Sequence, residues 1–243
     1  MEAVLSSLPP RVTDVLKRFV DNCKTAFKDN LVSIVLYGSA AEGKLRATSD
    51  VNVILVLKKF ELEQVDQIRE ELRLGRATVQ LGVMFLLENE VMGASESFAV
   101  KFNDILHRHQ VLHGSDPFAN LRISREATIQ RLRQVLFNLE LRMRERYAMV
   151  SLREEQLILA VADFASPVRV CAQTLLELKG EKPENPKEAL RSFAKTVQGD
   201  FTKVLEAVSH VRETRELEPG EATPVMKGLM MLVDQMQLQV RGL

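Results

Sequence analysis

The sequence has few cysteines, no excess of either charge and no long apolar run. Cys23 and Cys171 are the two cysteines in 243 residues. They lie far apart in apolar helical patterns, which favours buried thiols over a disulfide or a metal pair. Basic and acidic residues number 33 each, so no basic field attracts nucleic acid, which is not an expected partner. No apolar segment approaches the roughly 20 residues that span a bilayer, so we expect a soluble, cytoplasmic protein with no membrane partner.

What the sequence does contain is a strand pattern that ends at a Gly-Ser pair. Residues 32–37 (Val-Ser-Ile-Val-Leu-Tyr) are mostly apolar and β-branched, which is typical of a buried strand. Gly38 and Ser39 follow directly, so the strand should turn sharply there. Glycine lets the backbone approach a ligand closely, Ser39 offers a hydroxyl, and the amides that open the next turn attract an anion. The turn is therefore a candidate phosphate site.

A second strand pattern begins after a spacer of ten residues that follows Ser39. Residues 50–57 (Asp-Val-Asn-Val-Ile-Leu-Val-Leu) predict a strand whose period of two places Asp50 and Asn52 on one face. Both side chains carry oxygen atoms, the ligands that Mg²⁺ prefers. Beside a phosphate turn they predict a site for a metal and a nucleotide.

These two strands, the Gly-Ser turn and the spacing to Asp50 resemble the DNA polymerase beta-like nucleotidyltransferase superfamily. The resemblance implies that Gly38 and Ser39 hold the triphosphate of an NTP and that Asp50 binds Mg²⁺. It places Asn52 where relatives carry a second metal-binding aspartate, so one full negative charge is missing. Glu42 stands where many relatives carry arginine. Both differences make the site less suited to a polyphosphate.

A third carboxylate on a later strand completes the site in the superfamily, and the resemblance places it near residues 98–104. We expect a strand over Phe98–Phe102. Asp104 is the acid that this stretch offers, so it is the candidate catalytic base; its alternative role is that of a turn or cap residue. Lys101 would repel a metal but could bind a phosphate.

The remaining pattern divides the chain into an α+β part and an all-α part. We expect helices over 10–28 and 62–72, the second ending at Gly75, and a third strand over 79–87. The predicted domains are a nucleotidyltransferase-like mixed sheet over residues 1–118 and a bundle of about five helices over 119–243. A helix over 154–165 should be followed by a hairpin or a kink at Ser166-Pro167, where another helix begins.

One helix of the second part carries a regular apolar seam. Over residues 124–150 the apolar positions alternate steps of three and four, nearly a heptad repeat. The residues are Ile129, Leu132, Leu136, Leu139, Met143 and Val150. This seam is either the core of the bundle or the contact of a homodimer.

The sequence leaves two functions open. One is Mg²⁺-dependent transfer of a nucleoside monophosphate from an NTP such as ATP to a hydroxyl on an unidentified small molecule or protein. The other is a catalytically inactive pseudoenzyme that binds nucleotide or another protein. Gly38, Ser39 and Asp50 favour retained nucleotide handling, whereas Asn52 and Lys101 favour lost catalysis.

Overall fold

A computed structural model describes residue 5, residues 7–46 and residues 48–243. The chain forms two compact units that divide between Ile123 and Ser124. The expected boundary lay at residue 118. Phe118 is buried, and Leu121 and Ile123 pack against the same core cluster of the first unit. The link after the sheet is therefore part of the first unit.

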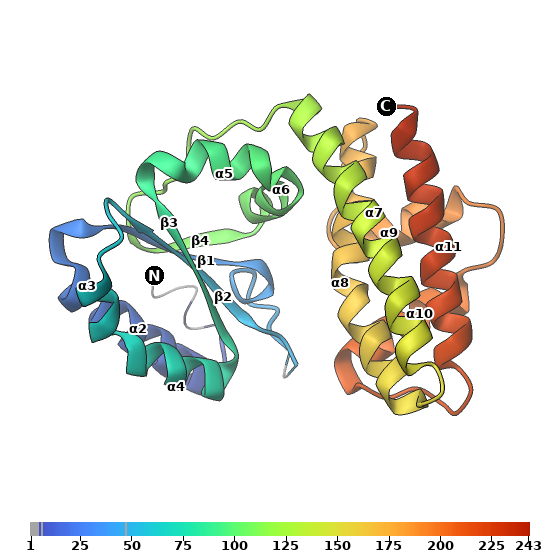
Figure 1. Cartoon of the computed structure of the whole chain (residues 1–243), viewed down its shortest axis with the longest axis horizontal. Helices are drawn as coiled ribbons and strands as arrows, with labels where there is room; N and C mark the ends of the chain where they lie inside the picture. Colours follow the sequence, from blue (N-terminus) through green and yellow to red (C-terminus); the bar gives the residue numbers. More distant parts are fainter. Residues whose placement is uncertain (1–4, 6, 47) are drawn as a thin grey trace. The chain divides into compact units, whose positions relative to one another are not determined.

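The first unit is built on a four-stranded mixed sheet with the order β3-β2-β1-β4 (Figure 1). The strands are β1 (Leu31–Tyr37), β2 (Val51–Leu57), β3 (Leu81–Leu87) and β4 (His109–Gly114). β1 pairs antiparallel with both β2 and β4, and β2 pairs parallel with β3. The central pair is almost completely buried, because helices cover both faces of the sheet. The α+β fold is as predicted.

Alternating side chains of the two central strands enter two different cores. Leu36, Val53 and Leu55 pack with α2 (Pro10–Phe27), α3 (Leu62–Gln67) and α4 (Arg69–Val79) on one face. Val35, Ile54 and Val56 pack with α5 (Val91–Ser97) and α6 (Ala99–His107) on the other. Figure 1 shows these two helical layers on opposite sides of the sheet. Because both faces of the two central strands are buried, their sequences are apolar at successive positions and not only at alternate ones.

The helix expected to stop at Gly75 continues to Val79 and ends where Gln80 adopts a left-handed conformation. Gly75 has another role, because a Cβ there would lie 2.7 Å from Cδ2 of Leu81. The glycine lets α4 pack closely on the beginning of β3. Because α4 extends through Val79, the third strand begins at Leu81 and not at Val79.

The prediction of a strand over Phe98–Phe102 is wrong, because Phe98 caps α6, Ala99 begins it, and the fourth strand is β4. Ala99, Phe102 and Ile105 are fully buried. Their spacing of three residues is that of a helix and not of a strand. A short apolar run does not distinguish the two structures without the residues that follow it. Lys101 and Asp104 therefore lie on a helix.

The second unit is helical throughout its described residues. Its helices are α7 (Arg125–Val150), α8 (Glu154–Leu178), α9 (Pro186–Lys195), α10 (Thr202–Thr214) and α11 (Ala222–Arg241). Ser124 caps α7 by accepting a hydrogen bond from the Ala127 amide, and Asn185 caps α9 through the amides of Lys187 and Glu188. The expected number of about five helices is confirmed. The expected break at Ser166-Pro167 is not a hairpin, because Pro167 lies inside the single helix α8.

The apolar seam of α7 belongs to the core of this unit. Leu132, Leu136 and Met143 are completely buried, and α7 packs on both α8 and α11. The alternative of a dimer contact through these side chains is excluded in this fold, since they have no surface to offer.

One described helix, α8, is long and apolar enough to cross a membrane by length and composition. In the fold, 67% of its most apolar window is buried. The core helix of a bundle has the same properties, so this is weak evidence for a membrane span.

Candidate nucleotide site

The predicted phosphate turn is a short 3-10 helix, Gly38–Ala40, directly after β1. Gly38 has a φ of +79°, which side chains of other residues rarely tolerate. Its amide donates to the carbonyl of Arg108 at 2.8 Å, so the turn is fixed to the end of α6. Among the described residues, no heavy atom lies within 4 Å of a Cβ placed on Gly38. The glycine is therefore needed for its conformation and leaves room for a ligand.

Asp50 and Asn52 lie beside this turn, at the end of β2 that pairs with the end of β1. Asn52 is the cross-strand partner of Tyr37 on β1 and of Gly82 on β3. Asp50 precedes the strand and is exposed. The Asn52 amide donates weakly to the carbonyl of Asp50 at 3.4 Å, and a Cβ on Gly82 would lie 3.1 Å from Oδ1 of Asn52. The glycine of β3 therefore provides space for the Asn52 side chain.

Tyr37 is the residue around which the predicted site residues gather. Burial raises the pKa of its phenol, and the negative charges of Asp104 and Asp50 raise it further. The ammonium of Lys101 lies 5.6 Å from the centre of the Tyr37 ring, at the distance of a cation–π contact. The fold thus brings Asp50, Asn52, Lys101 and Asp104 together, although two of them come from a helix that the sequence pattern did not predict.

A network of ion pairs occupies the helix side of the site. Nε and Nη2 of Arg108 donate to Oδ1 of Asp104 at 2.9 and 2.6 Å, and Nη2 also contacts Oδ2. Nη1 donates to Glu42 at 3.3 Å. Burial alone would lower the pKa of Arg108, but the bonds and charges of Asp104 and Glu42 outweigh it and raise that pKa. The candidate base is therefore held by a guanidinium.

The sequence reasoning missed Tyr37 and Arg108 as site residues. Arg108 follows Asp104 by four residues, which is the spacing of an ion pair on a helix. This spacing predicts the ion pair only if residues 99–107 are taken to form a helix. The contact between Arg108 and Glu42 joins positions far apart in the sequence, and no local pattern reveals it.

The donors present do not fit a site in which three carboxylates hold two metal ions. Among the described residues, no three His, Cys, Asp or Glu side chains form a group that could bind a metal. Asp104 is engaged by Arg108, and Asn52 is neutral. Asp50 and Asn52 do fit one Mg²⁺ that arrives with a nucleotide, because Mg²⁺ needs only one or two carboxylates when phosphates supply further ligands.

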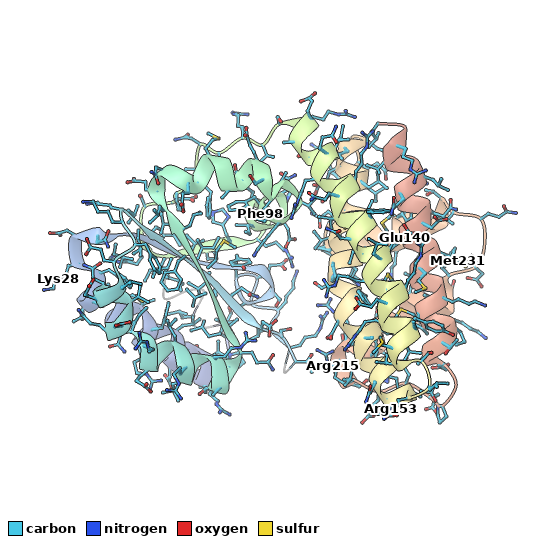
Figure 2. The ribbon with its side chains drawn as sticks, in the orientation of Figure 1. Lys28, Phe98, Glu140, Arg153, Arg215 and Met231 are labelled. Atoms are coloured by element: carbon cyan, nitrogen blue, oxygen red, sulfur yellow. The ribbon has the colours of Figure 1, made fainter. Side chains whose placement is uncertain are left out.

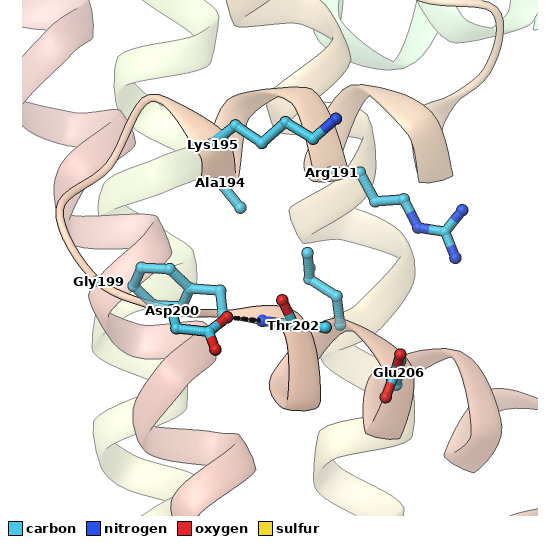
Figure 3. A pocket seen from close by; sticks show the side chains of 9 residues that line it. Arg191, Ala194, Lys195, Gly199, Asp200, Thr202 and Glu206 are labelled. Atoms are coloured by element: carbon cyan, nitrogen blue, oxygen red, sulfur yellow. Dashed lines mark hydrogen bonds between the residues drawn. The ribbon is translucent and has the colours of Figure 1, made fainter.

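Among the pockets of the described residues, two in the helical unit involve none of these site residues. Figure 3 shows one of about 320 Å³ between α9 and α10, with Arg191 and Lys195 on one side and Asp200 and Glu206 on the other. The second, of about 540 Å³, lies between α7 and α8. Each is lined by charges of both signs and contains no predicted site residue.

Comparison with known proteins identifies the first unit. Residues 16–106 match the family model of the nucleotidyltransferase domain. A candidate protein adenylyltransferase of Methanocaldococcus jannaschii is 34% identical over 56 residues, which are 23% of this chain and 38% of that protein.

A solved structure extends the likeness to both units. The chain superposes with a TM-score of 0.66 on the crystal structure of a spectinomycin adenyltransferase from Enterococcus faecialis with ATP and spectinomycin. The match covers 94% of this chain and 98% of the other at 9% identity, so it shows a shared fold. Residues 16–106 thus match a nucleotidyltransferase domain, and the Gly38–Ser39 turn and Asp50 both lie inside the matched stretch.

Proposed function

We propose that this protein binds Mg-ATP at the Gly38–Ser39 turn and transfers AMP to a hydroxyl acceptor. The observation that carries the proposal is the positive-φ turn, fixed by the Arg108 carbonyl and placed beside Asp50, inside a nucleotidyltransferase domain. ATP is the first candidate donor because both relatives are named as adenylyltransferases.

Each side of the site has a role in this proposal. The turn amides and the Ser39 hydroxyl bind phosphate oxygens, as amides at the beginning of a helical turn do. Asp50 and Asn52 would hold one Mg²⁺, which supplies positive charge to the leaving pyrophosphate. Lys101 adds a second positive charge from α6. The acceptor oxygen forms a bond to the α-phosphorus, the bond to pyrophosphate breaks, and the hydroxyl proton passes to a base or to solvent.

Two features of the site should make this transfer slow. Asp104 accepts hydrogen bonds from Arg108, so it must leave this ion pair before it can accept a proton. Asn52 contributes a neutral oxygen where an aspartate would contribute a charge. Less charge on the metal site means weaker stabilisation of the transition state, which is mostly electrostatic in phosphoryl transfer.

The test combines binding and turnover. Calorimetry with Mg-ATP should give a dissociation constant in the high micromolar range or weaker, about −5 kcal/mol, and Ser39→Ala or Asp50→Ala should weaken it. Transfer of AMP is then measured with ATP labelled at its α-phosphate, and spectinomycin or protein hydroxyls serve as trial acceptors. The release of pyrophosphate is measured in the same reactions. Unchanged binding after Asp50→Ala would overturn the assignment of the site.

A second candidate function is nucleotide or protein binding without transfer. The specific observation that favours it is the pairing of Asp104 with Arg108, together with the amide at position 52. Mg-ATP binding without pyrophosphate release, for every acceptor tried, would support this second function. Clear turnover by the unmodified protein would exclude it.

A further inference from the structure

The larger of the two pockets in the helical unit lies between α7 and α8 and has a volume of about 540 Å³. Its buried lining residues are apolar, because Val150, Ala160 and Phe164 are at most 7% exposed. Small-molecule sites are concave spaces of roughly 300–1,000 Å³ that combine an apolar lining with a few polar groups. The polar groups of this pocket come from its exposed residues, which are mostly charged: Arg142, Glu145, Arg146, Met149 and Asp163.

Two arginines of α7 offer unused hydrogen-bond donors to this pocket. Arg142 and Arg146 are four residues apart, so their side chains lie on the same side of the helix. In the part of the chain that the structure describes, neither guanidinium makes a hydrogen bond or an ion pair. Arg142 instead lies 5.9 Å from the centre of the Phe164 ring, at the distance of a cation–π contact. This contact uses none of the five N–H donors of the guanidinium, so both arginines can bind an anion.

The two carboxylates of the pocket do not cancel this positive charge. Asp163 accepts a hydrogen bond from Nη1 of Arg215 at 2.9 Å, so its charge is neutralised by a residue that does not line the pocket. Arg215, labelled in Figure 2, lies just after α10. Glu145 is then the single carboxylate of the lining that opposes Arg142 and Arg146, and positive charge is in excess.

We propose that this pocket binds a small organic anion, with the carboxylate or phosphate of the ligand between Arg142 and Arg146. The apolar part of the ligand would lie against Val150 and Ala160. Guanidinium groups bind carboxylates and phosphates through charge-assisted hydrogen bonds, which are stronger than bonds between neutral groups. Removal of apolar surface from water adds to the affinity. The proposal is independent of the proposed function, because the pocket contains no residue of the candidate nucleotide site.

The test uses probes that share one apolar ring system and differ in charge. Naphthyl phosphate and naphthoate carry the two candidate anionic groups, and naphthylmethylamine is the cationic control. Each is titrated into the full chain, and the methionine methyl resonances are followed by NMR, because Met149 lines the pocket and is 77% exposed. At least one anion should shift the Met149 resonance with a dissociation constant of about 1 mM, and the tighter anion identifies the charged group. The exposed Met92 and Met231, which do not line the pocket, should not shift.

Three variants of exposed residues test the charges of the pocket. Arg142→Gln and Arg146→Gln should each weaken binding of the anion roughly fivefold. Glu145→Gln removes the opposing charge and should strengthen binding about twofold. Arg144→Gln is the matched control on the same helix, because Arg144 bonds to Glu140 and does not line the pocket. It should leave the affinity unchanged, and thermal denaturation checks that all four variants are folded.

Several outcomes would overturn the proposal. Equal shifts of the Met149 resonance by the amine and the anions would show that the ring system alone decides binding. An equal loss for Arg144→Gln would show that the net charge of α7, and not the pocket, attracts the anion. If Ser39→Ala weakened binding of naphthyl phosphate as much as Arg142→Gln does, the probe would occupy the nucleotide site instead. A failure of the parent to bind Mg-ATP, by contrast, would overturn the proposed function and leave this inference standing.

Discussion

The two sides of the candidate site differ in how closely they follow the nucleotidyltransferase pattern that the sequence resembles. The strand side keeps the Gly38–Ser39 turn and Asp50 in the arrangement that the resemblance implies. On the helix side, Lys101 lies in the stretch where the resemblance places a third carboxylate, and Arg108 binds Asp104 and Glu42. Under the proposed function, the turn and Asp50 would hold the nucleotide, whereas the paired Asp104 and the neutral Asn52 would weaken transfer. A protein can therefore keep nucleotide binding while transfer weakens.

The largest expected effect comes from breaking the helix side. Arg108→Gln leaves Asp104 and Glu42, with side chains 16% and 25% exposed, without their shared cation. Removing one partner of a buried ion pair destabilises a protein strongly, and partial exposure reduces this to about 2–3 kcal/mol. Chemical denaturation at neutral pH measures the loss.

Arg191→Gln is the control in the helical unit. Arg191 pairs with Glu188 three residues before it on α9, and both side chains are exposed, at 43% and 40%. Surface pairs of this kind contribute about 0.5 kcal/mol. If Arg108→Gln cost no more than this control, the helix side would not be a tightly held network, and the comparison between the two sides would lose its basis.

The next effect comes from the strand side. Gly38→Ala places a side chain at a φ of +79°, which costs about 1–2 kcal/mol of stability. The strain should distort the turn and weaken Mg-ATP binding by roughly tenfold, or 1.4 kcal/mol. Thermal denaturation and calorimetry on the same sample give both quantities.

Gly180→Ala separates the strain from the binding. Gly180 has a φ of +86°, and, as at Gly38, no described heavy atom lies within 4 Å of its added Cβ. It lies in the helical unit, so its variant should lose similar stability and bind Mg-ATP like the parent. Equal binding by Gly38→Ala and Gly180→Ala would show that the turn does not contact the nucleotide.

The same contrast between the two sides decides what the sequence could predict. β1, the turn, β2 and α2 are local patterns with strong signals, and all were predicted within a residue or two. Helix α6 was not, because the apolar run from Phe98 to Phe102 suits either a strand or a helix, and burial against β1 and β2 decides between them. The helix side of the site depends on that decision and on the contact between Arg108 and Glu42, which no local pattern encodes.

Restoring the missing charge tests whether the strand side is an impaired catalyst. Asn52→Asp changes little volume and places a second carboxylate beside Asp50. Without metal, the two charges repel, which should cost about 1 kcal/mol and lower the melting temperature by about 2–4 °C. Added Mg-ATP should then raise the melting temperature of the variant more than that of the parent.

Asn138→Asp, an exposed change on α7, is the control for this variant and should shift neither temperature. Pyrophosphate release should stay near background for the parent protein. A rise in Asn52→Asp would show that the missing charge limits the chemistry. If Mg-ATP raised both melting temperatures equally, position 52 would not lie at the metal.

The smallest effect isolates the cation that the helix side contributes. Lys101→Gln removes one positive charge beside Tyr37 and should weaken Mg-ATP binding several-fold, by about 0.5–1 kcal/mol at low salt and by less at high salt.

Burial lowers the pKa of Lys101, and a lysine loses its charge as the pH rises through its pKa. As the pH rises, the affinity of the parent for Mg-ATP should therefore begin to fall at a lower pH than it would if Lys101 had the ordinary pKa of lysine. The Lys101→Gln variant should not show this fall. Lys58→Gln, an exposed change after β2, should keep the pH profile of the parent. Calorimetry across the alkaline range decides, since identical profiles for Lys101→Gln and the parent would mean that the helix side contributes no charge to phosphate binding.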